Sequence, residues 1–232
     1  MLSSIQVIFF DLGDTLVRIK LEILQDICRT INKKRRPPLE IHEYMADFRA
    51  EWSHHEIKDV TTHAQELVYW RGFFYNLLKN LGLPNSWSLV EKYADIYSDP
   101  ASFECFEDVH IVLPELQSRG YKLGLISNAF PSAVRIIHDL KLREYFEYKY
   151  TFLSFEIPDK YIKPEPEIYR YSSKKANVDI EHTLFVDDRW PFVKAALDVG
   201  MQAYLIERFS EENKQLVIKS LVPRIYDLYE LA

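Results

Sequence analysis

The chain has 232 residues, of which 47% are hydrophobic and 28% charged, and this composition is typical of a folded globular protein rather than a disordered one. A formal net charge of −6 argues against nucleic acid as the main partner, because phosphate backbones attract concentrated lysine and arginine. The short basic run 33–36 precedes two prolines, and we interpret it as a solvated loop.

The two cysteines, Cys28 and Cys105, are far apart and lack the spacing of metal ligands, which favours free thiols in a reducing cytoplasm. No signal segment precedes the first apolar stretch, and no apolar run approaches the length of about 18 residues that a membrane span needs. We therefore expect a cytoplasmic protein with no membrane partner.

The chain begins with a short apolar strand, continues through a helical insert and ends in alternating strands and helices. Five of the six residues at 5–10 are apolar, which is the pattern of a strand buried on both faces. Helical spacing of apolar residues predicts helices in the insert at 21–31, 41–52, 64–81 and 87–97. Beyond residue 100, strands are expected at 121–126, 148–153, 183–186 and 203–206, and helices at 109–118, 131–140, 164–177, 192–199 and 211–231.

This alternation implies right-handed crossovers and an α/β fold, with a parallel, Rossmann-like sheet between two layers of helices. Aromatic residues concentrate in the helical insert, which holds three of the four tryptophans. We expect these rings to form the core of the insert. They are Trp52, Tyr69, Trp70, Phe73, Phe74, Tyr75 and Trp87.

Polar side chains follow several of the predicted strands or lie in the loops beyond them. They are Asp11, Thr15, Ser127, Asn128, Lys163, Asp187 and Asp188. Because the carboxyl ends of parallel strands meet at one edge of a sheet, we expect these residues to converge. Two neighbouring carboxylates repel each other, which suggests a divalent cation between Asp11 and Asp188, and oxygen ligands favour Mg²⁺.

A lysine and a hydroxyl beside that cation are suited to hold a phosphoryl group, whose oxygens need positive or donor partners. Asp11 is then free to attack phosphorus and to form an aspartyl-phosphate that water hydrolyses. Taken alone, the stretch from Asp11 to Thr15 fits an ordinary turn at a strand end equally well.

Four motifs occur in a fixed order along the chain: 11–16 (Asp-Leu-Gly-Asp-Thr-Leu), 127–128 (Ser-Asn), 163–169 (Lys-Pro-Glu-Pro-Glu-Ile-Tyr) and 185–189 (Phe-Val-Asp-Asp-Arg). In this order and at these intervals the chain resembles the haloacid dehalogenase superfamily, in particular the subfamily with a helical cap inserted after the first motif. The resemblance covers the whole chain. It implies a core domain of residues 1–16 and 104–232 and a helical cap domain of residues 17–103.

The resemblance also implies roles for the motif residues. Asp11 is the expected nucleophile and Mg²⁺ ligand, Ser127 and Lys163 are expected to hold the phosphate, and Asp188 completes the metal site. The backbone carbonyl of Gly13 is expected to contribute a metal ligand, and Asp187 to support the site. We add Thr15 and Asn128 as candidate phosphate-binding residues, since they lie in the same motifs.

The chain departs from the family pattern at two positions. Phosphatases of this family usually carry a second aspartate, the general acid and base, two positions after the nucleophile, where this chain has Gly13. Loss of such a group costs roughly 10²–10⁴-fold in rate for a poor leaving group, and much less for an aryl or acyl phosphate. Asp14 is one residue further along and is assigned no such role. The second departure is Phe192, where the family often has a polar residue that supports the metal site.

The sequence therefore favours a Mg²⁺-dependent phosphatase of a small phosphorylated metabolite, a monomer or homodimer, in which the cap closes over the site. The alternative is a weak or inactive binding or regulatory protein, because Gly13 replaces the acid. Dehalogenase chemistry is less favoured, since a metal-free halide site has no use for Asp188 beside Asp11.

Overall fold

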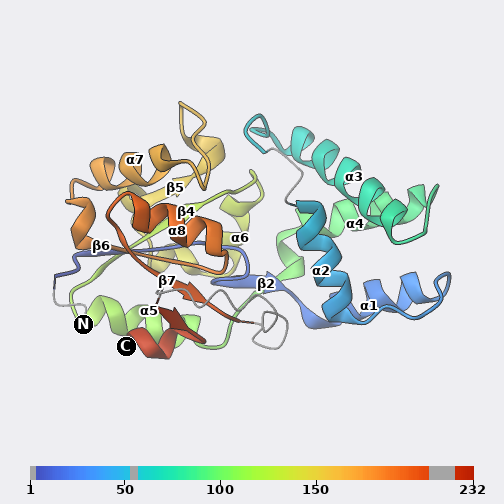
Figure 1. The fold of residues 1–232 in the computed structure, drawn as a ribbon, viewed down its shortest axis with the longest axis horizontal. Helices are drawn as coiled ribbons and strands as arrows, with labels where there is room; N and C mark the ends of the chain where they lie inside the picture. Colours follow the sequence, from blue (N-terminus) through green and yellow to red (C-terminus); the bar gives the residue numbers. More distant parts are fainter. Residues whose placement is uncertain (1–3, 53–56, 209–222) are drawn as a thin grey trace. The chain divides into compact units, whose positions relative to one another are not determined.

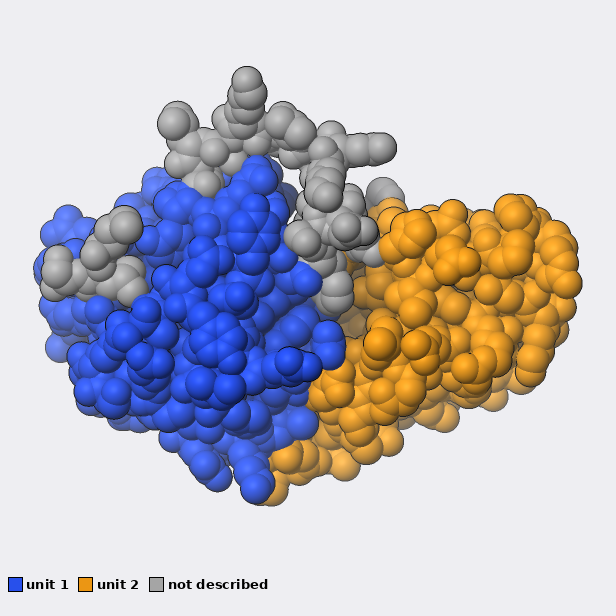
Figure 2. Space-filling model, turned by 90° about the horizontal axis from the view of Figure 1, so that it is seen from below, with its two compact units in different colours: residues 1–18, 105–129, 140–232 blue, residues 19–104, 130–139 orange. Residues whose placement is uncertain are grey.

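The computed structural model describes residues 4–52, 57–208 and 223–232 (Figure 1). The chain divides into two compact units, coloured separately in Figure 2. The sheet unit comprises residues 1–18, 105–129 and 140–232, and the helical unit comprises residues 19–104 and 130–139. Within the described ranges, no helix is long and apolar enough to cross a membrane.

The sheet unit is built on six parallel strands in the order β5-β4-β1-β6-β7-β8. They span Val7–Phe10 (β1), Lys122–Ser127 (β4), Thr151–Leu153 (β5), Thr183–Asp187 (β6), Gln202–Ile206 (β7) and Arg224–Ile225 (β8). In the centre of the sheet, Phe10 lies opposite Leu125 of β4 and Val186 of β6. All four residues of β1 are buried, as expected for a strand covered on both faces. The predicted parallel α/β fold is confirmed.

Helices α7 (Pro166–Ala176) and α8 (Trp190–Asp198) lie on one side of the sheet, and α5 (Val109–Ser118) lies on the other (Figure 1). Val7 and Phe9 belong to the apolar cluster that α7 and α8 cover. At Gly124 of β4 the backbone just before β5 comes very close, because a Cβ atom there would collide with the carbonyl oxygen of Tyr150. Only glycine fits at this point.

The helical unit contains α1 (Leu21–Asn32), α2 (Ile41–Trp52), α3 (His63–Asn80), α4 (Trp87–Ser98) and α6 (Ala133–Asp139). A capping box starts α3, in which Thr62 and Gln65 each accept a hydrogen bond from the other's backbone N–H. The chain passes between the two units at β2 (Val17–Ile19) and β3 (Phe103–Cys105), which pair as a small second sheet.

The helix α6 clusters with the helical unit rather than with the sheet unit. The buried carboxylate of Glu66 on α3 accepts hydrogen bonds from the backbone N–H and the hydroxyl of Ser132, just before α6. The ring of Phe130 also packs against Trp70 with a centroid distance of 5.0 Å. Phe130 and Ser132 are thereby held against α3 within the helical unit.

The aromatic core of the helical unit is only partly as predicted. Trp70, Phe73 and Phe74 are buried, but Trp87 is 57% exposed and Tyr75 37% exposed. These two rings stack on each other with a centroid distance of 5.2 Å, so the expectation that they belong to the core was wrong. Mutual stacking lets each ring cover part of the other while it stays at the surface.

The predicted C-terminal helix at 211–231 was also wrong where it can be compared. Residues 209–222 lie outside the described residues, and 224–225 form β8, followed by a 3₁₀ turn at Leu228–Leu231. The apolar residues Ile225, Leu228 and Leu231 are three apart, a spacing that a strand followed by a 3₁₀ turn also satisfies. The backbone N–H groups of Leu205 and Glu207 hold this segment at the sheet edge.

Candidate active site

Asp11 directly follows β1, and the loop beyond it folds back tightly. The N–H of Asp11 donates to the carbonyl of Val186, while the N–H groups of Leu16 and Val17 both donate to the carbonyl of Leu12. Asp14 has a φ of +55°, a left-handed conformation that aspartate tolerates better than most residues. The carboxylate of Asp11 is thus held at the carboxyl end of the central strand, where it is 8% exposed.

Lys163 reaches this carboxylate from a loop more than 150 positions away in the sequence. Its ammonium donates to Oδ1 of Asp11 and to Oδ2 of Asp187, each at 2.6 Å, and the residue is only 2% exposed. Burial by itself lowers the pKa of Lys163, but the negative charges of Asp11 and Asp187 raise it by more, and the net shift is upward. Lys163 is therefore a permanent cation at neutral pH.

Asn128 fixes the backbone of Lys163. Its side-chain Oδ1 accepts from the N–H of Lys163 at 2.7 Å, and its Nδ2 donates to the carbonyl of Lys163 at 2.8 Å. Both polar ends of the Asn128 amide are thus engaged with the lysine backbone. The motif after β4 thereby positions the cation that neighbours Asp11.

Asp187 is the last residue of β6, and Asp188 follows it directly. Asp11, Asp187 and Asp188 each offer a carboxylate oxygen, and these oxygens lie within 4.8 Å of one another. Asp187 is fully buried and accepts the backbone N–H of Arg189 at 2.8 Å. Lys163 forms ion pairs with Asp11 and Asp187, and among the described residues no cation pairs with Asp188, so the three carboxylates share one ammonium.

Burial, together with repulsion between the carboxylates, raises the pKa values of Asp187 and Asp188. Burial raises the pKa of Asp187 to about 6, even though the adjacent Lys163 acts in the opposite direction. Burial and the charges of Asp187, Asp14 and Asp11 raise the pKa of Asp188 well above its usual value. A set of carboxylate oxygens that carries this much unneutralised charge fits a hard divalent cation.

The remaining predicted residues surround the same sheet edge. Ser127 is the last residue of β4, which neighbours β1, and it is buried. Thr15 is fully buried, and its hydroxyl has no hydrogen-bond partner within the described part of the chain. At Gly13 an added Cβ would meet no atom within 4 Å.

Sequence reasoning missed Arg208, which supports the loop that follows Asp11. Its Nε and Nη2 donate to the carbonyl of Thr15 at 3.1 and 2.9 Å, and its Nη1 pairs with Asp108 at 2.5 Å. The side chains of Arg208 and Asp108 are at most 5% exposed. No motif or spacing marks either residue, because the partners are far apart in sequence and the contact is to a backbone carbonyl.

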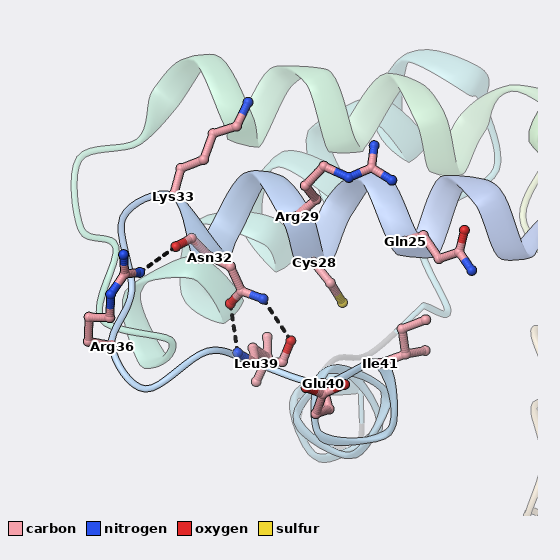
Figure 3. Close-up of a pocket in the computed structure, with 9 residues that line it drawn as sticks. All are labelled: Gln25, Cys28, Arg29, Asn32, Lys33, Arg36, Leu39, Glu40 and Ile41. Carbon is pink, nitrogen blue, oxygen red and sulfur yellow. Dashed lines mark hydrogen bonds between the residues drawn. The ribbon is translucent and has the colours of Figure 1, made fainter.

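A separate groove of about 550 Å³ lies in the helical unit (Figure 3). In Figure 3 the side chains of Arg29 and Lys33 extend away from Cys28, and Nη1 of Arg36 donates a hydrogen bond to the carbonyl of Asn32 at 2.8 Å. The cations therefore do not converge on one point. The groove contains none of the predicted site residues, and it is lined by Gln25, Cys28, Arg29, Asn32, Lys33, Arg36, Leu39, Glu40 and Ile41.

The family model for haloacid dehalogenase-like hydrolases matches residues 5–200 of this chain. The chain belongs to that family. The glyceraldehyde 3-phosphate phosphatase of Pyrococcus abyssi (strain GE5 / Orsay) is 30% identical to this haloacid dehalogenase-like hydrolase over 211 residues, which is 85% of this chain and 79% of the relative. The mouse (Mus musculus) haloacid dehalogenase-like hydrolase domain-containing protein 3 is 24% identical over 168 residues, which is 71% of this chain and 64% of the relative, slightly under two thirds of that protein's length.

The fold is shared with solved structures across the family. The crystal structure of the L-2-haloacid dehalogenase RSc1362 superposes with a TM-score of 0.73 at 16% identity, covering 99% of this chain and 97% of that one. The shared fold agrees with the family model over residues 5–200, which confirms the predicted superfamily. Because these similar proteins include both phosphatases and dehalogenases, membership by itself identifies a hydrolase and not the bond it cleaves.

Proposed function

We propose that this haloacid dehalogenase-like hydrolase is a Mg²⁺-dependent phosphatase of a small phosphorylated molecule, with Asp11 as the nucleophile. The observation that carries the proposal is the cluster of Asp11, Asp187 and Asp188 around the buried ammonium of Lys163. Displacement of a halide needs a nucleophile and an anion site, but it does not need a third, unneutralised carboxylate. The 30% identity to a glyceraldehyde 3-phosphate phosphatase supports the same choice.

The oxygen donors at the sheet edge fit Mg²⁺. In this proposal Asp11, Asp188 and the backbone carbonyl of Gly13 hold the ion, and Asp187 supports the site through Lys163. When bound, the ion supplies positive charge that offsets the carboxylates and the phosphoryl oxygens. We also propose that residues 1–16 and 104–232 form the catalytic core, and that the helices of residues 17–103 act as a cap that selects the substrate.

The chain's own residues then carry the reaction. The Asp11 carboxylate attacks phosphorus, the bond from phosphorus to the leaving oxygen breaks, and an aspartyl-phosphate forms. Water hydrolyses this acyl phosphate, which regenerates Asp11 and releases inorganic phosphate. Lys163 holds the nucleophile at 2.6 Å and offers positive charge to the phosphoryl group, together with donors from Ser127 and Thr15. Asn128 acts by positioning Lys163.

Gly13 restricts the leaving group. Without a carboxylic acid at this position, a poor leaving group loses roughly 10²–10⁴-fold in rate, whereas acyl and aryl phosphates depart without a proton. Acyl and aryl phosphates are therefore the favoured substrate class. The alternative from a different class, a weak or inactive regulatory protein that retains the metal site, depends on the same residue.

Two substitutions test the proposal in assays with p-nitrophenyl phosphate and an alkyl phosphate in the presence of Mg²⁺. We expect the native chain to hydrolyse p-nitrophenyl phosphate, Asp11→Asn to abolish turnover, and Asp198→Asn, at an exposed ion pair on α8, to leave it unchanged. Gly13→Asp meets no steric obstacle and no positive φ, so we expect it to raise turnover of the alkyl phosphate. Activity that survives Asp11→Asn would overturn the covalent mechanism. If the native chain shows no hydrolysis and the Gly13→Asp variant is active, the regulatory alternative is favoured instead.

A further inference from the structure

Two aromatic rings lie close to the buried ammonium of Lys163. The ammonium nitrogen lies 4.9 Å from the ring centroid of Phe192 and 5.2 Å from that of Phe185. Phe185 is fully buried and Phe192 is 7% exposed. The cation therefore contacts two carboxylate oxygens and two aromatic rings.

The Phe192 ring is itself held in place and contacts a second cation. The hydroxyl of Tyr169 donates to the carbonyl of Phe192 at 2.8 Å, which fixes the backbone in the first turn of α8. The guanidinium carbon of Arg189 lies 4.4 Å from the Phe192 centroid. Among the described residues, no carboxylate pairs with the Arg189 side chain, which instead lies over this ring.

This arrangement has a physical consequence for Lys163. An ammonium has three N–H groups, and two of them are used by Asp11 and Asp187. The face of an aromatic ring attracts a cation through its quadrupole, and the attraction grows when water is excluded, as it is around this buried lysine. A ring can therefore stabilise the ammonium without offering a competing acceptor that would draw it away from the carboxylates.

We propose that Phe192 is a positioning residue whose ring holds the Lys163 ammonium against Asp11 and Asp187. This inference rests on the proposed function, in which Lys163 orients the nucleophile. Phe192 acts through the lysine and does not touch the substrate. It thus performs, by a cation–π contact, a supporting task at the position where the family often has a polar residue.

Fluorination of the ring tests the proposal with little change in shape. Mono-, di- and trifluorinated phenylalanine at position 192 weaken the quadrupole stepwise, and we expect kcat to fall stepwise, by about tenfold over the series, with KM changed less than twofold. The matched control is the same series at Phe152, which is also 7% exposed and packs against Phe9. Over the described residues, no cation lies on the Phe152 ring, so we expect kcat to stay constant there. A flat kcat series at 192, or equal falls at both positions, would overturn the proposal.

A spectroscopic measurement separates this inference from the proposed function. The ring current of Phe192 shifts the Hε protons of Lys163 upfield, and Lys163→Arg identifies their signal by removing it. We expect Phe192→Leu to move the signal downfield, and Phe192→Tyr to retain the native shift and most of the native kcat. An unchanged Lys163 signal in Phe192→Leu refutes the positioning role even if the enzyme is active. A native chain without turnover but with the expected shifts refutes the phosphatase function alone.

Discussion

Magnesium should stabilise the folded protein much more at about pH 7.5 than at about pH 5, because protons and the metal compete for the same carboxylates. Asp188, a proposed ligand of the ion, has a pKa raised well above 3.8, and burial raises the pKa of the adjacent supporting residue Asp187 from 3.8 to about 6. A carboxyl group with a higher pKa in the folded state binds more protons when folded than when unfolded. Its contribution to stability is therefore complete below about pH 4 and is lost as the pH rises through about 6.

The size of this effect follows from the shift. Two pKa units correspond to about 3 kcal/mol, which the metal-free protein loses between acid and neutral pH. Asp188 acts in the same direction, since its pKa is also raised. Bound Mg²⁺ restores stability only where the carboxylates are ionised. At a concentration 100 times the dissociation constant, the ion contributes about 2.7 kcal/mol, and each kcal/mol raises the Tm of a chain of this size by about 2–4 °C.

Calorimetric melting with Mg²⁺ or with EDTA, at matched ionic strength and at both pH values, measures this effect. We expect a rise in Tm of about 5–10 °C from Mg²⁺ at the higher pH and less than about 2 °C at the lower. Asp188→Asn should remove the response, and Asp198→Asn, at the exposed pair with Lys194, should preserve it. Equal responses at both pH values, or a full response in Asp188→Asn, would refute the assignment of the carboxylate cluster as the binding site.

Three further substitutions probe the supports of the site. Lys163→Met leaves two buried carboxylates without their cation. We therefore expect the free energy of unfolding in urea to fall by about 3–5 kcal/mol and turnover to be lost. A loss of less than about 1 kcal/mol would contradict the buried pairing. Arg208→Met removes two hydrogen-bond donors from the carbonyl of Thr15, so we expect the free energy of unfolding to fall by about 3 kcal/mol and turnover to slow. The control Arg119→Met, at an exposed ion pair, should lower it by less than about 1 kcal/mol. Gly124→Ala forces a Cβ against a carbonyl oxygen, and thermal melting should show a loss of about 1–3 kcal/mol or more.

The architecture of the sheet unit was predictable because its signals are local and repetitive. Apolar runs bounded by turn residues predict buried strands, and helices between them require parallel crossovers. The convergence of Asp11, Lys163 and Asp187 then follows from topology, since parallel strands place their carboxyl ends at one edge. Their order along the chain was sufficient to predict that they meet, which the 2.6 Å contacts of Lys163 confirm.

What the sequence did not predict depends on which way a side chain faces. Trp87 has a large aromatic side chain of the kind found in cores, but it is exposed because it stacks on Tyr75 instead of entering the core. The sequence did not predict that the amide of Asn128 is hydrogen-bonded to the backbone of Lys163; the phosphate-binding role of Asn128 stays a prediction. Arg208 was missed because no sequence pattern predicts a hydrogen bond to a backbone carbonyl far away in the chain.

A buried ammonium between two buried carboxylates is better explained by function than by stability. Removing such charges from water costs nearly as much as their attraction returns, so apolar side chains of similar volume would serve the sheet equally well. Burial raises the pKa of Asp187 to about 6 although Lys163 lies 2.6 Å away, and Asp188 pairs with no cation among the described residues, so one ammonium is shared by three carboxylates. An uncompensated negative charge at the end of the central strands destabilises the fold unless a cation joins it. That charge excess is the physical reason to prefer metal-assisted phosphoryl chemistry over halide displacement at Asp11.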